Sequence, residues 1–377
     1  MDYKKFYQEN MYGTWREGEE VTYEFLGEDP ALTDPSKKPS NPFAPFGGEL
    51  IKIKVAMSGK ATSFTVHAYI PDETARGSFK KRHLKSDAFT NSGEGIPFII
   101  CMHPIQPKDY LLDRGIAVFF MESVSIATDD TRHLGAFYEL YPYGDDPYDQ
   151  TGVLMAWAWG ASKVLDAVYA GLDKEFGLDP KASMVTGVSR WGKATAVCGA
   201  FDSRFFLSVP ACSGAGGLAL YNCFSEGRVY DFSAAGGPKQ YKYEKNEPLD
   251  CLQSEAERGW FNDRFLSYKK PEEIPVDQYG LPVMAMSPDR AYFMIAAYTG
   301  EDWVNAPSMW ECYKEADKVY AQNGLSDHLA IHFHLAGHAV LKEDTELFLK
   351  YFDKMYYGLP AISDMRPFKT TLFAGQE

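Results

Sequence analysis

The sequence predicts an α/β fold in which a mostly parallel, eight-stranded sheet is flanked by helices in a three-layer sandwich. Six short, continuous apolar runs are typical of parallel strands that are covered on both faces. Segments of helical period separate many of these runs, and a pair of alternating segments precedes them. With 377 residues, of which 45% are hydrophobic, the chain can form a single domain with insertions over residues 1–377, and we expect that organisation.

The first part of the chain is polar and rich in proline, as in DPSKKPSNPFAPFGG. We therefore expect residues 1–48 to form an irregular lead-in that lies over the domain surface. From residue 49 onward the pattern alternates with period two, in LIKIKVAM and SFTVHAYIP, with SGKAT between them. These segments predict an antiparallel hairpin at one edge of the sheet.

The predicted parallel strands are the runs IPFIICMHP, GIAVFFMES, ASMVTGVS, FFLSVPACSG, AYFMIAAYTG and LAIHFHLAG. The clearest predicted helix is TGVLMAWAWGASKVLDAVYAGL, in which apolar residues recur at intervals of three and four. Residues 218–280 fit this pattern less well, because they are polar, aromatic and rich in glycine. We expect an insertion or lid there, at the carboxyl edge of the sheet, where substrates are usually held.

Composition excludes several classes of function. A formal net charge of -14, without a basic cluster interleaved with aromatics, disfavours nucleic-acid binding. The six cysteines are scattered, which predicts reduced thiols and no metal site. The sequence as written shows no signal peptide and no apolar run of the roughly 18 residues that a membrane span requires. We therefore expect a cytoplasmic protein, or a secreted one if a leader was trimmed, with no membrane partner and as a monomer.

The sharpest local feature is the string VTGVSRWGKATAV, in which an apolar strand ends at Gly187 and a turn is centred on Ser189. This strand-turn-helix context lifts a serine hydroxyl out of a sheet and directs the backbone N–H of the next residue, Arg190, towards a reacting carbonyl. The spacing is G-x-S-x-x-G, one residue longer than the usual pattern. By itself, the string fits a Gly-Ser turn that caps a helix equally well.

A nucleophilic serine requires a base, and the last predicted strand supplies a candidate. That strand runs into Gly337 and His338, which places an imidazole at the same edge of the sheet as Ser189. His332 and His334 lie inside the strand, and we expect them to be structural. His338 is therefore the predicted general base.

The base in turn requires an acid, and Asp302 follows the preceding strand by a short turn. The order serine, acid, histidine is the one found in α/β-hydrolases. A carboxylate there would fix the imidazole tautomer and stabilise the imidazolium. The neighbouring Glu301 is an alternative, and a solvated acid in a turn remains an open interpretation for Asp302.

The string GVSRWGKATAVCGAFDSRFFLSVPACSGAGG resembles the nucleophile region of the glucuronoyl esterases, carbohydrate esterase family 15, whose hallmark is G-C-S-R-x-G-K. Val188 replaces the cysteine of that hallmark. The resemblance extends from about Pro97 to Leu359 and includes AWAWGASKVLD, ERGWF and GLSDHLAIHFHLAGHAV. It implies an α/β-hydrolase fold and hydrolysis of the ester between 4-O-methyl-glucuronic acid on xylan and an alcohol of lignin. By position, Ser189 would be the nucleophile and His338 the base.

The same resemblance implies further roles by position. The guanidinium of Arg190 would assist the oxyanion hole, and Lys193 would bind sugar hydroxyls, since fixed cations stabilise developing negative charge in a site that excludes water. Glu257, ahead of the W-F pair, would contact the sugar, and Trp303 would stack on the uronate. Each of the last two has a structural alternative, because Glu257 also fits a solvated helix charge and Trp303 a core aromatic.

One position departs from the family pattern. Many members carry the triad acid in a P-x-E-S-G-x-G-G string, whereas this chain reads PACSGAGG and has Cys212 at that position. A thiol does not stabilise an imidazolium as a carboxylate does. We therefore expect Asp302 to supply the acid and Cys212 to serve as a packing residue.

Three functions remain open from the sequence. The first is a serine carboxylester hydrolase that cleaves a carbohydrate uronate ester, with no cofactor and no metal. The second is an acetyl-xylan esterase or another carbohydrate deacetylase with the same triad. The third is an inactive, carbohydrate-binding homologue that lost catalysis with its acid. Arg190, Lys193 and Glu257 discriminate the first from the second, because a neutral acetyl group gives no reason for cations beside the acyl group.

Overall fold

The computed structural model describes residues 1–39, 45–83, 95–103, 107–221, 229–230, 241–242, 247, 249–297, 302–335 and 337–359. Its main sheet has nine strands in the order β1-β2-β3-β5-β4-β6-β7-β10-β11. The strands are β1 Glu20–Glu28, β2 Glu49–Met57, β3 Lys60–Tyr69, β4 Ile96–Cys101, β5 Ala117–Met121, β6 Leu178–Val188, β7 Leu207–Ala211, β10 Ala291–Ala297 and β11 Leu329–His334.

The first strands are antiparallel, and from β5 to β11 the neighbouring strands run parallel. This is the mixed α/β sheet of the α/β-hydrolase fold that the sequence predicts. The apolar runs expected to be parallel strands all form such strands, and β4, β5, β7 and β10 are buried at every position. Because parallel neighbours end at one edge, the residues after β6, β7, β10 and β11 come close together.

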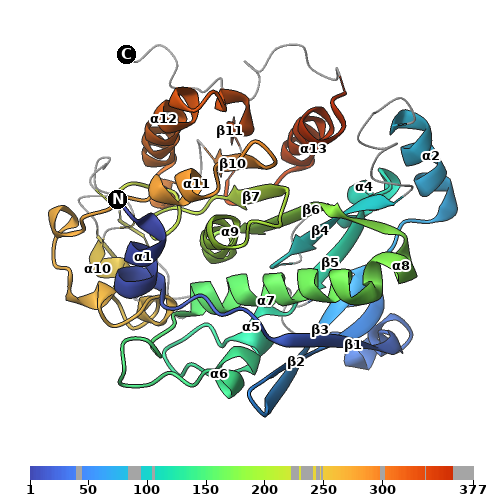
Figure 1. Cartoon of the computed structure of the whole chain (residues 1–377), viewed down its shortest axis with the longest axis horizontal. Helices are drawn as coiled ribbons and strands as arrows, with labels where there is room; N and C mark the ends of the chain where they lie inside the picture. Colours follow the sequence, from blue (N-terminus) through green and yellow to red (C-terminus); the bar gives the residue numbers. More distant parts are fainter. Residues whose placement is uncertain are drawn as a thin grey trace.

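Helices flank the sheet. They are α1 Tyr3–Tyr7, α2 Glu73–His83, α4 Lys108–Asp113, α5 Ser123–Ile126, α6 Ala136–Leu140, α7 Val153–Ala167, α8 Asp173–Phe176, α9 Arg190–Phe201, α10 Leu249–Leu252, α11 Gly280–Met284, α12 Ala306–Gln322 and α13 Lys342–Tyr357. Figure 1 shows β1 to β3 at one end of the sheet, with α7 running lengthwise beside them, and α12 and α13 beside β10 and β11 at the other end.

The sheet has one strand more than predicted, because β1 lies within residues 1–48, which were expected to be irregular. β1 pairs antiparallel with β2 and forms the edge of the sheet. None of its residues is buried, so its sequence lacks the buried alternating face that reveals a half-buried strand. The expectation of an irregular lead-in was therefore wrong for this segment.

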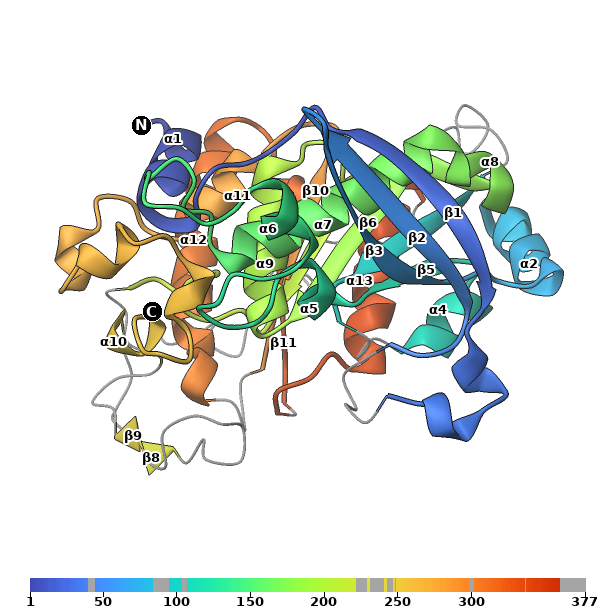
Figure 2. The ribbon, with the colours of Figure 1, turned by 90° about the horizontal axis from the view of Figure 1, so that it is seen from below.

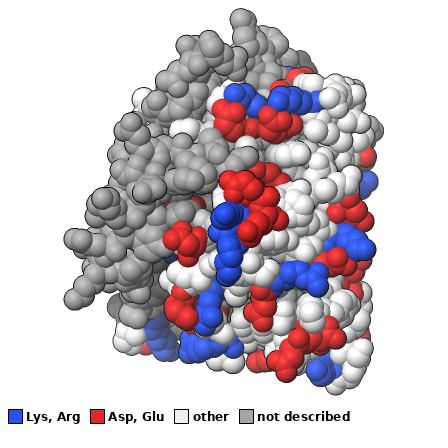
Figure 3. All heavy atoms as spheres, turned by 90° about the vertical axis from the view of Figure 1, so that its left-hand side faces the viewer, with Lys and Arg blue, Asp and Glu red and all other residues white. Residues whose placement is uncertain are grey.

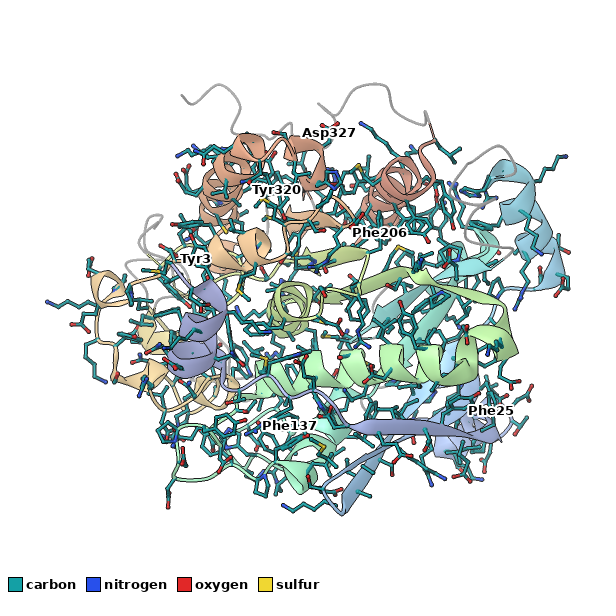
Figure 4. All side chains as sticks on the ribbon, in the orientation of Figure 1. Tyr3, Phe25, Phe137, Phe206, Tyr320 and Asp327 are labelled. Carbon is teal, nitrogen blue, oxygen red and sulfur yellow. The ribbon has the colours of Figure 1, made fainter. Side chains whose placement is uncertain are left out.

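The central helix α7 fixes the N-terminal part of the chain to the core. Its residues are all buried except Asp166. The ring centroid of Trp159 lies 5.3 Å from that of Phe137 in α6, and Figure 4 labels Phe137. The buried ammonium of Lys163 lies 2.9 Å from a carboxylate oxygen of Glu19, and the Trp159 indole donates to the same carboxylate at 2.7 Å. A buried charge requires such pairing, so these contacts fix the segment that leads into β1.

The predicted insertion at residues 218–280 contains short elements where the structure describes it. Among them are the pair β8 Val229–Tyr230 and β9 Tyr241–Lys242, α10, and a 3₁₀-helix at Arg258–Trp260. Figure 2 shows the β8–β9 pair apart from the main sheet, on the side where α10 lies. Whether the segment acts as a lid stays a prediction.

On the face that contains α1 and α10, acidic and basic side chains lie among one another, as Figure 3 shows. In the part of the chain that the structure describes, no helix combines the length and apolar character that crossing a bilayer requires.

Candidate active site

Ser189 occupies the sharp turn between β6 and α9. Its backbone has φ 62° and ψ −128°, a conformation that residues other than glycine rarely adopt. Glycines on both sides make the turn possible. A Cβ at Gly187 would lie 2.6 Å from the Trp191 carbonyl oxygen, and a Cβ at Gly192 would lie 2.2 Å from the Ala211 carbonyl oxygen. The strained conformation is the one expected of a serine presented as a nucleophile.

The turn is connected to the loop that carries His338. The Ser189 N–H donates to the carbonyl of Ala211 at 3.0 Å. The next residue, Cys212, has its sulfur 3.7 Å from the carbonyl oxygen of Ala339. These contacts, together with the shared sheet edge, place the predicted nucleophile and the predicted base in one region.

The environment of His338 favours the neutral imidazole. The residue as a whole is exposed, but protein atoms surround the imidazole closely enough to desolvate a charge. This burial, followed by the positive charges of Lys193 and Arg190, lowers the pKa of His338 to about 4. A neutral imidazole is the form that accepts a proton from a serine hydroxyl.

The loop after β11 is held in place by contacts among His332, His334 and Asp344. His334 Nδ1 lies 2.9 Å from Asp344, and His334 Nε2 lies 3.0 Å from the carbonyl oxygen of Gly337. Both ring nitrogens thus face acceptors. Although burial opposes a charge on His334, the hydrogen bonds to Asp344 outweigh it and raise the pKa of His334. His332 Nε2 lies 3.2 Å from the same carboxylate, so Asp344 lies close to both histidines.

Two positions, Cys212 and Asp302, were considered for the triad acid, and the structure describes the side chain of the first but only the backbone of the second. Cys212 is fully buried, and burial together with Asp344 raises the pKa of its thiol to about 12. The thiol is therefore neutral and cannot stabilise an imidazolium. Asp302 begins a 3₁₀-helix, Asp302–Val304, after β10, the strand between β7 and β11. Its side chain, like all of Glu301, lies outside the described residues.

Lys193 lies at the centre of a buried polar group behind the serine turn. Its ammonium donates to the carbonyls of Ser213 and Ala215, both at 2.6 Å, and to Glu247 at 2.7 Å. An ammonium has three N–H donors, so these acceptors use all of them. Lys193 would contact a sugar hydroxyl only by exchanging one of these partners.

Glu257 lies close to this group, and its carboxyl oxygen Oε2 is buried without a hydrogen-bond partner among the residues that the structure describes. Burial, reinforced by the Glu247 carboxylate, raises the pKa of Glu257 to about 8. A buried polar atom without a partner is an available contact for a hydroxyl group of a ligand. Trp303 is partly buried and packs against the hydrophobic core.

The guanidinium of Arg190 is held in place by a residue that the sequence did not indicate. Its Nη1 lies 2.6 Å from Oδ2 of Asp129, and the indole of Trp260 donates to the other oxygen of that carboxylate at 2.7 Å. Asp129, Glu247 and Asp344 could not be identified from the sequence. The polar string ATDDTRH was a weak signal for the first, but nothing local to these residues identifies their partners.

Comparisons with known proteins identify relatives of this chain. Residues 53–324 match the family model described as "Glucuronyl esterase, fungi". A multidomain esterase of Ruminococcus flavefaciens is 41% identical over 98% of this chain and 44% of its own length. A 4-O-methyl-glucuronoyl methylesterase of Podospora anserina is 29% identical over 77% of this chain and 53% of its own length.

A solved structure shows the same relationship. The carbohydrate esterase family 15 glucuronoyl esterase of Caldicellulosiruptor kristjansonii is 29% identical, with a TM-score of 0.77 over 98% of this chain and 87% of that one. The chain spans about half the length of the two curated relatives, 44% and 53%.

Proposed function

The chain belongs to the glucuronoyl esterase family, and from this premise we propose that it is a serine carboxylester hydrolase that cleaves carbohydrate uronate esters. The observation that supports the proposal best is the strained backbone of Ser189, at φ 62°, between β6 and α9. The loop with His338 lies at the same edge, and two cations follow the serine. This arrangement suits acyl transfer.

In the proposed mechanism, Ser189 Oγ attacks the ester carbonyl while His338 accepts its proton. His338 then gives the proton to the departing alcohol, which leaves an acyl-enzyme. Water attacks the acyl-enzyme with His338 again as base, and the uronic acid is released. Asp302 is proposed to orient His338 and to stabilise its imidazolium form.

Negative charge develops on the carbonyl oxygen in each tetrahedral intermediate. We assign its stabilisation to the backbone N–H and the guanidinium of Arg190. The first N–H groups of a helix have no intrahelical acceptor, and they carry the positive end of the helix dipole. Because Arg190 is the first residue of α9, both its N–H and its side chain belong to this positive region.

The sugar part of the substrate is proposed to meet Glu257 and Trp303. The unpartnered oxygen of Glu257 suits a sugar hydroxyl, and the indole of Trp303 suits the apolar face of a pyranose ring. Lys193 is proposed to join them by exchanging one of its three present acceptors for a hydroxyl.

The proposal is tested by comparing hydrolysis of benzyl or methyl glucuronate with hydrolysis of para-nitrophenyl acetate. We expect kcat/KM to favour the glucuronate esters by about a hundredfold or more, because Glu257, Trp303 and Lys193 are proposed to contact the sugar acid and have nothing to contact in an acetate. A preference for acetate would indicate the deacetylase instead. Absence of turnover, combined with a Ser189 that does not react with a fluorophosphonate probe, would indicate a binding protein.

The pH dependence of the reaction follows from the surroundings of the base. Because the pKa of His338 is lowered to about 4, the imidazole is neutral above that pH and activity is lost as the pH falls through it. We expect the acid limb of kcat/KM below the ordinary histidine value of about 6.5. In Arg190→Gln, which lacks one of the two cations, the limb should move upward. Initial rates between about pH 4 and about pH 8 measure this.

A limb at or above about 6.5 in the wild type would contradict this expectation. It would show that the carboxylate proposed to orient the base, Asp302, raises the pKa of His338 more than burial and the two cations lower it.

A further inference from the structure

We propose that Asp129 is a positioning residue for the oxyanion hole, because it holds the guanidinium of Arg190 beside Ser189. This inference rests on the proposed esterase function. Asp129 lies in the loop between α5 and α6, Arg190 begins α9, and Trp260 ends the 3₁₀-helix of the insertion. Three segments that are far apart in the sequence thus meet at one carboxylate.

The contacts of the carboxylate are divided between two donors. Oδ2 of Asp129 accepts from Arg190 Nη1 at 2.6 Å, and Oδ1 accepts from Trp260 Nε1 at 2.7 Å. The indole therefore fixes the carboxylate, which in turn fixes the guanidinium. Charge-assisted hydrogen bonds of this length are among the stronger ones in proteins. The side chain of Asp129 is only 20% exposed, against 36% for Arg190.

The indole of Trp260 also limits where the guanidinium can lie. The guanidinium carbon of Arg190 lies 5.2 Å from the ring centroid of Trp260 and 5.8 Å from the ring centroid of Trp191. Trp260 itself is buried, with 2% exposure. The guanidinium is thus held between aromatic surfaces and one carboxylate, and its rotamer freedom is restricted before substrate arrives.

The loop with Asp129 has its own fixed position. The indole of Trp157 in α7 donates to the carbonyl of Ala127 at 3.0 Å, and the Thr128 N–H donates to the Leu134 carbonyl at 2.8 Å. The insertion packs directly on this loop, because a Cβ at Gly259 would lie 2.4 Å from a backbone oxygen of the loop. A rigid support is what precise placement of a charged donor requires.

The chemical consequence concerns the donors that remain. A guanidinium has five N–H donors, and among the described residues Arg190 uses one atom, Nη1, for Asp129. The other nitrogens remain available for the oxyanion and for the acyl group. Without Asp129, the long side chain would sample many rotamers in solvent. Transition-state stabilisation would then fall while ground-state binding of the sugar changed little.

The test is a double-mutant cycle on the full chain with the preferred uronate ester. We expect Asp129→Asn to lower kcat by about ten- to a hundredfold with KM nearly unchanged, because an oxyanion donor is weakened and not removed. The carbonyl oxygen of an asparagine can accept a hydrogen bond from one of the two donors. Its NH₂ group would then face the other donor and cannot accept from it. In the Arg190→Ala background the same substitution should lower kcat by less than about twofold, since the group to be positioned is gone.

The matched control is Asp130→Asn. Asp130 is the adjacent residue and also pairs with an arginine, Arg132 at 2.6 Å, but that arginine is 66% exposed. We expect this variant to keep the wild-type kcat. Thermal unfolding of each variant separates a folding defect from a positioning defect.

Three results would overturn the inference while the wild type still turns over the ester. They are equal losses from Asp129→Asn in both backgrounds, a change confined to KM, and an equal loss of kcat from Asp130→Asn. An inactive wild type would instead refute the proposed function on which the inference rests.

Discussion

Replacing Ser189 by alanine is expected to lower kcat for the uronate ester by about 10⁵-fold or more and to abolish labelling by a fluorophosphonate. The reason is that the proposed acyl-enzyme forms on this hydroxyl, and removing a nucleophile of this kind removes nearly all of the covalent pathway. The backbone at φ 62° presents the side chain from the turn between β6 and α9. Steady-state turnover and mass spectrometry of the labelled protein measure the two effects.

The backbone strain at Ser189 supplies a second readout of the same site. Glycine adopts positive φ freely, whereas alanine at φ 62° keeps the steric penalty. Ser189→Gly should therefore be equally inactive but unfold at a higher temperature than Ser189→Ala. Ser267→Ala, at an exposed serine outside the site, is the control and should retain turnover and labelling. Undiminished labelling in Ser189→Ala would place the nucleophile elsewhere.

The fold could be predicted from the sequence largely because burial determines its pattern. The helix α7 and the runs that became β4, β5, β7 and β10 are buried almost throughout, so their apolar residues are continuous in the sequence. The strand β1 was missed because none of its residues is buried, and its pairing with β2 depends on backbone hydrogen bonds. Such an edge strand leaves little trace in residue hydrophobicity.

The candidate site likewise has a part that could be predicted from the sequence and a part that could not. The positions of Ser189 and His338 at one edge of the sheet could be predicted because each follows an apolar strand and parallel strands end at one edge. Their catalytic roles stay predictions. The partners of the charged groups could not be predicted. Asp129 reaches Arg190 across 61 positions of sequence, and Glu247 reaches Lys193 across 54. Nothing in the residues around Asp129 or Glu247 records these pairings, which arise from the packing of separate loops.

Replacing Asp302 by asparagine is expected to lower kcat by about a hundredfold or more, while Cys212→Ala should change it by less than about threefold. The acid position that the family resemblance implies is occupied by the thiol of Cys212, whose pKa is raised to about 12 by burial and by Asp344. Such a thiol remains neutral and cannot compensate a charged imidazole. If the chain is an active esterase, a carboxylate from another position must therefore orient His338.

Topology favours Asp302 for this role. It follows β10, which lies between β7 and β11 in the sheet, so its backbone comes to the same edge as His338. An asparagine there would retain the shape but would not stabilise the imidazolium, and it would permit the wrong imidazole tautomer. Glu301→Gln distinguishes the neighbouring carboxylate, and we expect it to keep most of the activity. If Asp302→Asn kept full activity and Glu301→Gln lost it, the acid would be Glu301. A large loss in Cys212→Ala alone would contradict the argument from the neutral thiol.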